Sequence, residues 1–427
     1  MPFYDNAYTR SHQFETRYSG VAFMGRNFNF RVLELKDEQL GFDLFLIDIP
    51  ELLFTDFVYS ENDTERFLAF QIAALNWIVQ HKDAPSVVHC HDHHTGLVPF
   101  MMSHSEAYQS LKSTPSILTI HNAQYQGWFS HDKLHLIPKF PLSKIGLLEW
   151  DHSINPLAAA IKCAWRVTTV SPSYMEELKV RANGLEGLLA HESAKCVGIL
   201  NGIDWKVWNP ETDEYLVKNY TNTSVLSGKK ANKAFLCERF DLDPKRPLFS
   251  FIGRLVGEKG ADLFPEIFHN ALMSAEISVL LLGSGHDEVE QRLNDLKKLH
   301  PGTFNAYIGY SEELSHIMYA GSDFLLMPSR VEPCGLNQMY SLRYGTVPIV
   351  SSVGGLKDTV IDIGNDGFGI RHDHVTVGEV VYAIQRGKQF FDNEKEFKKI
   401  RKRIMKIDHS WNGSAKEYIQ LYKSLIP

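Results

Sequence analysis

The sequence predicts an α/β protein built from two doubly wound domains that face a central cleft. Short apolar runs alternate with longer amphipathic ones, which is typical of βαβ units around a parallel sheet. At 427 residues the chain is too long for one ordinary core, so two domains are expected. The alternation pauses in a polar stretch after Asn201, which places the boundary near residue 203. The predicted domains are therefore 1–203 and 204–408.

The first series of elements begins at Gly41, where a short apolar run is followed by a run with helical spacing. A serine and a proline, Ser171 and Pro172, follow its last strand and suit the N-cap and first position of a helix. The predicted strands are 44–49, 86–90, 116–120 and 166–170, and the predicted helices are 65–80 and 96–105.

The second series repeats the same pattern after the polar stretch. Each of its strands is followed by a helical run, as a second doubly wound sheet requires. The predicted strands are 248–252, 278–282, 304–308, 323–327 and 347–350. Helices are expected over 378–391, 395–407 and 414–425, and the C-terminal segment 409–427 is expected to pack back onto the first domain.

Composition and charge exclude several classes of protein. A net charge of -7 argues against nonspecific attraction to nucleic acid or to an anionic membrane. The start of the chain does not read as a signal peptide, and no apolar run approaches the roughly 18 residues of a membrane span. The five cysteines are odd in number and scattered, a pattern that favours a reducing compartment. We therefore expect a cytoplasmic protein, and the oligomeric state stays open.

The segment after strand 323–327 carries a carboxylate and a glycine at a strand end. Pro333 keeps Glu332 out of the helical region. Gly335 permits close backbone approach where amides converge at the start of a helix. Ligands of open α/β sheets bind just past the carboxyl ends of strands. The segment therefore predicts a ligand site.

Two cations, Arg254 and Lys259, lie in a glycine-containing loop after strand 248–252. Arginine offers a planar fork and lysine a point charge, and together they suit a diphosphate. The loop has neither a Walker motif nor a G-x-G-x-x-G pattern, so an ATPase or a dinucleotide site is not favoured. An ordinary solvated loop with basic residues is the alternative.

Histidines gather in the first domain at 89–94 and at His121. Imidazole and carboxylate are good zinc ligands. Successive residues of a strand point to opposite faces, however, so the cluster does not turn to one ion, and no metal is expected. His91 and Asp92 are instead expected to orient a loop and contact a ligand, and the hydrogen-bonding side chains after His121 suggest a sugar.

Seven segments, in order along the chain, resemble those of bacterial glycogen synthases and plant starch synthases, glycosyltransferase family 5. They are 89–96, 119–127, 169–172, 200–204, 254–260, 328–338 and 354–359. The resemblance implies the GT-B fold and a retaining glucosyltransferase that elongates an α-1,4-glucan such as glycogen from ADP-glucose. It implies neither a metal nor another cofactor.

The resemblance also implies roles for individual residues. Arg254 and Lys259 would hold the diphosphate, Glu332 would contact the donor, and His121 would approach the sugar from the other domain. The further substrate-binding residues that it implies are Asp92, Asn122, Asn201, Cys334, Gly335, Leu336, Gly354 and Gly355. The preference for ADP over UDP stays open.

One departure from the family concerns the start of the chain. The family opens with a Lys-Thr-Gly-Gly-Leu loop, whereas the only Gly-Gly pair here is Gly354-Gly355. The first domain is therefore expected to be N-terminally incomplete. Two alternatives to the synthase follow: a truncated, noncatalytic homologue that binds glucan or nucleotide, and a metal-dependent hydrolase that uses the cluster at 89–94.

Overall fold

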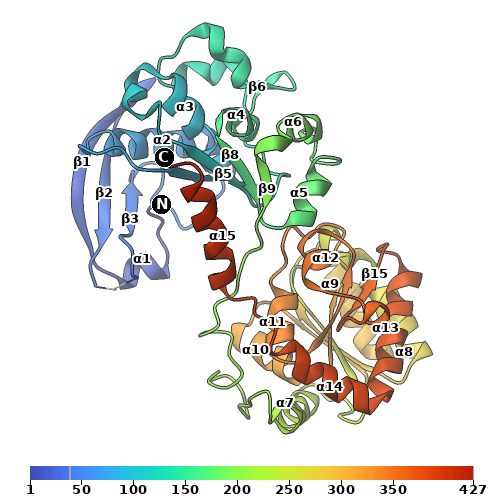
Figure 1. Ribbon diagram of the computed structural model, residues 1–427. Helices are drawn as coiled ribbons and strands as arrows, with labels where there is room; N and C mark the ends of the chain where they lie inside the picture. Colours follow the sequence, from blue (N-terminus) through green and yellow to red (C-terminus); the bar gives the residue numbers. More distant parts are fainter. Residues whose placement is uncertain (38–39, 427) are drawn as a thin grey trace. The chain divides into compact units, whose positions relative to one another are not determined.

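The computed structural model describes residues 1–37 and 40–426, and contacts within the chain divide it into two compact units (Figure 1). Unit 1 comprises Met1–Thr169, Met175–Val197 and Gln420–Pro427, and unit 2 comprises Val170–Tyr174 and Gly198–Ile419. Pro427, the end of the predicted segment 409–427, lies outside the described residues.

Unit 2 is built on a six-stranded sheet in the order β12-β11-β10-β13-β14-β15, in which all neighbouring strands are parallel. The strands are β10 (Leu248–Ile252), β11 (Ser278–Gly283), β12 (Phe304–Ile308), β13 (Phe324–Met327), β14 (Val347–Ser351) and β15 (Ile370–His372). The five strands predicted for this domain are confirmed, because buried parallel strands are short and mostly apolar. The sequence pattern missed the edge strand β15.

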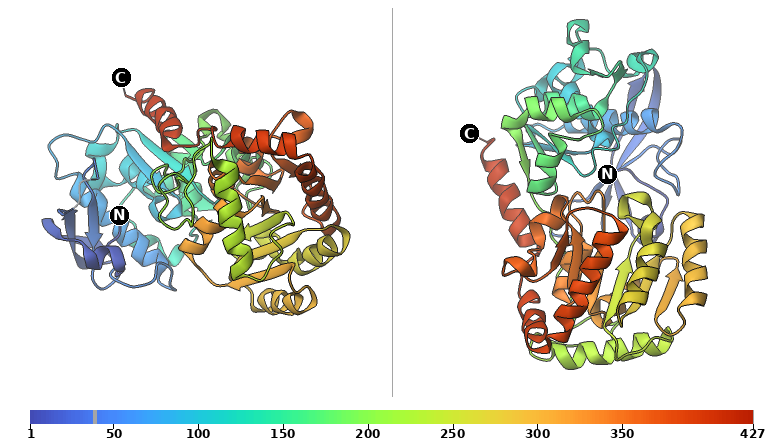
Figure 2. Two further views of the ribbon diagram at one scale, coloured as in Figure 1. Left: turned by 90° about the horizontal axis from the view of Figure 1, so that it is seen from below. Right: turned by 90° about the vertical axis from the view of Figure 1, so that its right-hand side faces the viewer.

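Helices cover both faces of this sheet (Figure 2). In β10 and β11 alternate residues face opposite cores: Phe249 and Leu281 enter one, and Leu248 and Leu280 enter the other. The first core is closed by α8 (Phe264–Ser274), α9 (Asp287–Leu299), α13 (Val377–Asp392) and α14 (Glu394–Ile404), and the second by α7 (Val225–Arg239) and α10 (Glu312–Gly321). Unit 2 is therefore doubly wound, as predicted.

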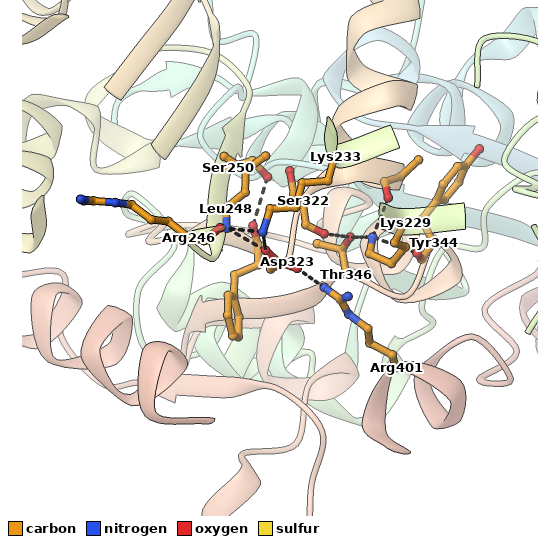
Figure 3. Close-up of polar contacts among 12 residues, drawn as sticks. Lys229, Lys233, Arg246, Leu248, Ser250, Ser322, Asp323, Tyr344, Thr346 and Arg401 are labelled. Carbon is orange, nitrogen blue, oxygen red and sulfur yellow. Dashed lines mark hydrogen bonds and ion pairs between the residues drawn. The ribbon is translucent and has the colours of Figure 1, made fainter. Parts of the chain in front are cut away.

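A buried polar network lies where β13 begins (Figure 3). Asp323, only 2% exposed, accepts hydrogen bonds from Lys233 Nζ at 2.7 Å and from the backbone N–H of Leu248 at 2.8 Å, and it pairs with Arg401. Beside it, Lys229 Nζ donates to the carbonyls of Tyr319, Ala320 and Tyr344 and to the hydroxyl of Thr346. A buried carboxylate persists because it is paired and hydrogen-bonded. The network joins α7 and α14 to the sheet.

Unit 1 contains a four-stranded sheet in the order β4-β5-β8-β9, and the first three strands are parallel. The strands are β4 (Val88–His91), β5 (Ser116–Ile120), β8 (Arg166–Thr169) and β9 (Cys196–Gly198). The helices named in this unit are α2 (Asp63–Ile78), α3 (Val98–His104), α4 (Pro156–Cys163) and α6 (Glu186–His191). The predicted strands and helices between residues 65 and 170 are confirmed within a few residues at each end.

A second sheet of unit 1 corrects one prediction. Segment 44–49 does contain a strand, β3 (Phe45–Asp48), but it pairs antiparallel with β2 (Arg26–Leu35), which pairs antiparallel with β1 (Phe14–Met24). Its expected place in a parallel sheet was wrong. The connection from β2 to β3 is too short for the crossover that parallel strands need, whereas an antiparallel pair accepts a short loop.

The last helix, α15 (Trp411–Lys423), is confirmed, and the chain from Gln420 onward belongs to unit 1. Within that unit, the Tyr422 hydroxyl lies 2.8 Å from His89 Nδ1. Among the described residues, no helix combines the length and the apolar character that crossing a membrane requires.

Candidate active site

Three adjacent strands of unit 2, β10, β13 and β14, bring most of the predicted site residues together. Arg254 and Lys259 follow β10, Glu332 follows β13, and Gly354 follows β14. The strand order reverses between β10 and β13, and a ligand of an open α/β sheet binds at such a switch point.

Lys259 and Glu332 form an ion pair at this edge. Lys259 ends the short helix η6 (Gly257–Lys259), and its Nζ lies 2.5 Å from Glu332 Oε2. The Ser329 hydroxyl donates to the same oxygen at 2.9 Å, and Glu332 is only 8% exposed. A lysine ammonium carries three donors, so the pair with Glu332 leaves two N–H groups for a phosphate.

Arg254 lies apart from this pair. Its side chain is 65% exposed, and its guanidinium approaches Glu258 at 3.6 Å. Such an exposed pair contributes little stability, so the guanidinium can turn to an anionic ligand. Arg254 lines a neighbouring pocket instead of contacting Glu332.

The segment from Cys334 to Leu336 connects this carboxylate to helix α11 (Asn337–Arg343) and is seated on two glycines. Gly335 has a φ of 70°, which favours glycine. A Cβ at Gly354 would lie 2.1 Å from the Glu332 carbonyl oxygen, and one at Gly355 would lie 2.0 Å from that of Cys334. Helix α12 (Gly354–Thr359) therefore approaches the segment as closely as backbone allows.

Cys334 is a packing residue. It is 5% exposed, and burial raises the pKa of its thiol to about 12, while a hydrogen bond from the backbone N–H of Asn201 opposes that shift. The thiol does not have the lowered pKa of a reactive cysteine at a helix start, because desolvation of the thiolate outweighs the nearby amides. The same hydrogen bond places Asn201 beside the segment.

A pocket of about 350 Å³ opens beside Arg254, at the carboxyl ends of β10, β11 and β12. Its wall includes Gly253, Arg254, Gly283, Ser284, Gly309, Tyr310, Trp208, Asn337 and Tyr340. Tyr310 is part of this wall and is 84% exposed. Sequence reasoning missed Tyr310 and Trp208; a tyrosine directly after a strand end and a glycine was the available signal.

The predicted site residues of unit 1 form a separate group at the ends of β4 and β5. His91 Nδ1 lies 3.0 Å from His121 Nε2, and Asp92 Oδ1 accepts the backbone N–H of His121 at 2.7 Å. Asp92 adopts a φ of 54°, unusual for a residue with a side chain. Asn122 follows and caps its own turn through the N–H of Gln124, 3.0 Å away. The structure thus joins His91, Asp92, His121 and Asn122.

His89 stacks on His91 with ring centroids 4.5 Å apart, and both of its ring nitrogens meet hydroxyls. Nδ1 lies 2.8 Å from the hydroxyl of Tyr422 and Nε2 lies 2.7 Å from that of Thr119. Burial, and then the neighbouring imidazoles of His91 and His121, lower the pKa of His89 to about 3. His89 is therefore neutral at physiological pH.

The same geometry bears on the metal-dependent hydrolase. Cys90 points into the core, and burial raises its thiol pKa to about 12, whereas a metal ligand must be a thiolate. Residues 1–37 and 40–426 contain no group of three or more His, Cys, Asp or Glu side chains placed to hold a metal ion.

Comparison with known proteins identifies the family of the chain. Residues 1–191 match the family described as starch synthase catalytic domain, and residues 233–375 match glycosyl transferases group 1. The glycogen synthase of Flavobacterium johnsoniae is 50% identical over 430 residues, which cover 100% of this chain and 91% of that protein. This chain belongs to the glycogen synthase family. It is a glucosyltransferase of the glycogen and starch synthase type.

A second glycogen synthase and a solved structure of a starch synthase are also similar to this chain. The glycogen synthase of Anoxybacillus flavithermus is 36% identical, over 91% of this chain and 82% of that protein. The catalytic domain of starch synthase IV from Arabidopsis thaliana, bound to ADP and acarbose, superimposes with a TM-score of 0.89 at 29% identity, over 100% of this chain and 91% of that one. The GT-B fold is thereby established.

Proposed function

We propose that this glycogen synthase family member transfers glucose, with retention of configuration, from ADP-glucose to an α-1,4-glucan. The observation that carries the proposal is the meeting of Lys259, Glu332 and the segment from Cys334 to Leu336 beside a pocket lined by Arg254. The starch synthase IV domain of similar structure holds ADP and acarbose, a nucleotide and a saccharide.

The nucleotide is assigned to the pocket beside Arg254. Tyr310 offers an exposed ring on which a base can stack, and aromatic stacking of a base is worth about 1–3 kcal/mol. Arg254 at the pocket wall and Lys259 beyond it then lie along the path of the diphosphate. The donor would place its base and its charge on residues from different loops of unit 2.

The chemistry follows from charge. As the bond from glucose to the diphosphate breaks, the sugar becomes oxocarbenium-like and negative charge grows on the leaving group. Fixed cations aimed at that charge are the largest catalytic contribution available to the site. Glu332, held by Lys259 and Ser329, is assigned to the donor glucose.

The residues of unit 1 are assigned to the binding of a sugar. His121 and Asn122 are assigned to hydrogen bonds with sugar hydroxyls, and Asp92 fixes the His121 backbone in place. We assign no metal to the reaction, because Arg254 and Lys259 supply the positive charge. The five cysteines, all free and scattered, support a reducing compartment such as the cytoplasm.

The test is incorporation of labelled glucose from ADP-glucose into glycogen by the purified chain. UDP-glucose is the comparison donor, and proton NMR of the product reports the anomer. We expect α-linked product with ADP-glucose and an unchanged rate in a chelator. Binding of glycogen without incorporation would instead support the noncatalytic alternative, and loss of activity in the chelator would overturn the metal-free assignment.

A further inference from the structure

A short segment of the chain, Val170–Tyr174, belongs to unit 2 although unit 1 precedes and follows it. It contains Ser171 and Pro172, predicted as the N-cap and first residue of a helix, and α5 (Pro172–Leu178) begins there. None of its residues has a part in the proposed function. Its contacts lead directly to that site.

Ser171 makes the first of these contacts. Its hydroxyl donates to the carbonyl oxygen of Pro333 at 2.6 Å and accepts the backbone N–H of Tyr174 at 3.2 Å. Ser171 is fully buried. Pro333 lies between Glu332 and Cys334. The Ser171 hydroxyl therefore caps α5 and also holds the backbone of the segment from Glu332 to Leu336.

Ser173 and Asp358 make the second contact. Asp358 accepts the Ser173 hydroxyl at 2.6 Å and the Ser173 backbone N–H at 2.8 Å, one on each carboxylate oxygen. Hydrogen bonds to a carboxylate are about twice as strong as neutral ones. Asp358 belongs to α12, the helix that opens with Gly354 and Gly355.

Both contacts act on the carbonyl of Pro333, the first directly and the second through α12. The backbone N–H of Gly355 lies 3.2 Å from the carbonyl oxygens of both Glu332 and Pro333. The Pro333 carbonyl is therefore held by Ser171 on one side and by α12 on the other, and Asp358 ties those two sides together through Ser173. Movement of Pro333 would carry Glu332 and the amide of Gly335 with it.

We propose that Ser171, Ser173 and Asp358 form a clamp that positions Glu332 to Leu336 for glucosyl transfer. These are positioning residues, since each acts through the backbone of Pro333 or through α12. The proposal rests on the proposed function for its effect on catalysis, but the clamp itself is testable without turnover.

The variants are Ser171→Ala and Asp358→Ala, with Asp358→Asn as the conservative change that keeps one acceptor oxygen. Ser250→Ala is the matched control, because Ser250 is also fully buried and its hydroxyl donates to a backbone carbonyl, that of Phe324, at 3.1 Å. Ser250 lies within β10, away from Pro333. Ser171→Ala and Asp358→Ala each remove two hydrogen bonds, Ser250→Ala removes one, and none of the four changes adds volume.

The first measurement is alkylation of Cys334, followed by mass spectrometry of its peptide in the free protein. Cys334 is buried with a raised thiol pKa, so it reacts slowly while the clamp is closed. Loss of these hydrogen bonds should speed the labelling of Cys334 by at least about tenfold in Ser171→Ala and Asp358→Ala. Cys334 should be labelled more slowly in Asp358→Asn than in Asp358→Ala. In Ser250→Ala it should be labelled at the rate of the unchanged protein.

The second measurement is steady-state kinetics with ADP-glucose. We expect kcat to fall about tenfold in Ser171→Ala and Asp358→Ala, with a KM close to that of the unchanged protein, because the nucleotide pocket is untouched. Labelling of Cys334 no faster than in Ser250→Ala would overturn the clamp. An inactive unchanged protein with the expected labelling pattern would overturn the proposed function and leave the clamp standing.

Discussion

Lys259 Nζ lies 2.5 Å from Glu332 Oε2, although 73 residues separate the two in the sequence. The pair forms because β10 and β13 are neighbours in the sheet, so that the loops after them meet. One of these groups is assigned to the diphosphate and the other to the glucose. The pair therefore marks the point where the bond between them should break.

Replacing either cation should slow transfer strongly. We expect Lys259→Ala and Arg254→Ala each to lower kcat/KM for ADP-glucose by about 10²–10³, because each removes fixed positive charge from the leaving diphosphate. Lys298→Ala is the control, since Lys298 is 75% exposed and pairs with Asp295 on α9. Initial rates of glucose incorporation measure the effect. Near-normal transfer by Lys259→Ala would contradict the assignment of Lys259 to the diphosphate.

Tyr310 should govern nucleotide affinity. We expect Tyr310→Ala to raise the KM for ADP-glucose at least about tenfold with little change in kcat, since stacking contributes equally in the ground and transition states. Tyr310→Phe keeps the ring and should behave like the unchanged protein. Tyr382→Ala, at a tyrosine of α13 that is 63% exposed, is the matched control. An unaltered KM in Tyr310→Ala would place the base elsewhere.

His89 should make stability depend on pH. Its folded pKa of about 3 lies below the ordinary value of 6.5, so between these values the unfolded chain binds a proton that the folded chain does not. Its contribution to stability is thus complete above pH 6.5 and declines as the pH falls toward 3. In His89→Gln the decline should be shallower by up to about 1.4 kcal/mol per pH unit.

Denaturant unfolding at pH 7.5 and at pH 5 measures this difference, with His191→Gln as the control at an exposed histidine. If lowering the pH from 7.5 to 5 reduced the free energy of unfolding equally in His89→Gln and in the unchanged protein, His89 would not be held neutral by its surroundings.

Asp323 should stabilise unit 2 in a way that surface charges do not. Removing it leaves Lys233 and Arg401 without the buried carboxylate, and breaking such a pair costs about 3–5 kcal/mol. We therefore expect a large fall in Tm for Asp323→Ala by calorimetry. Asp295→Ala, which breaks an exposed pair with Lys298, should stay within about 0.5 kcal/mol of the unchanged protein. Equal Tm values for the two variants would refute a stabilising role for the network.

Much of the fold was predictable because the pattern of apolar residues within a short segment indicates a strand or a helix. The strands at 248–252 and 304–308 match β10 and β12 residue for residue, since a buried parallel strand is a short, mostly apolar run bounded by turn residues. The antiparallel pairing of β3 was missed because pairing depends on β1 and β2, partners that the apolar run at 44–49 does not specify.

Candidate residues could be named from the sequence, but their partners could not. The sequence places reactive or charged side chains just after predicted strands, and these are Arg254, Lys259, Glu332 and His121. Tyr310 was not predicted because the pocket that it lines is assembled from segments far apart in the sequence.

The sequence alone therefore determined the class of fold, the family resemblance and the residues that carry charge or hydrogen-bonding groups at the strand ends. Three further facts required the folded chain: Lys259 pairs with Glu332 while Arg254 lines a pocket, burial makes Cys334 a packing residue, and Ser171 reaches Pro333. The physical reason is that distance and desolvation arise from the order of strands and the packing of loops, whereas residue type and periodicity are written in the chain itself.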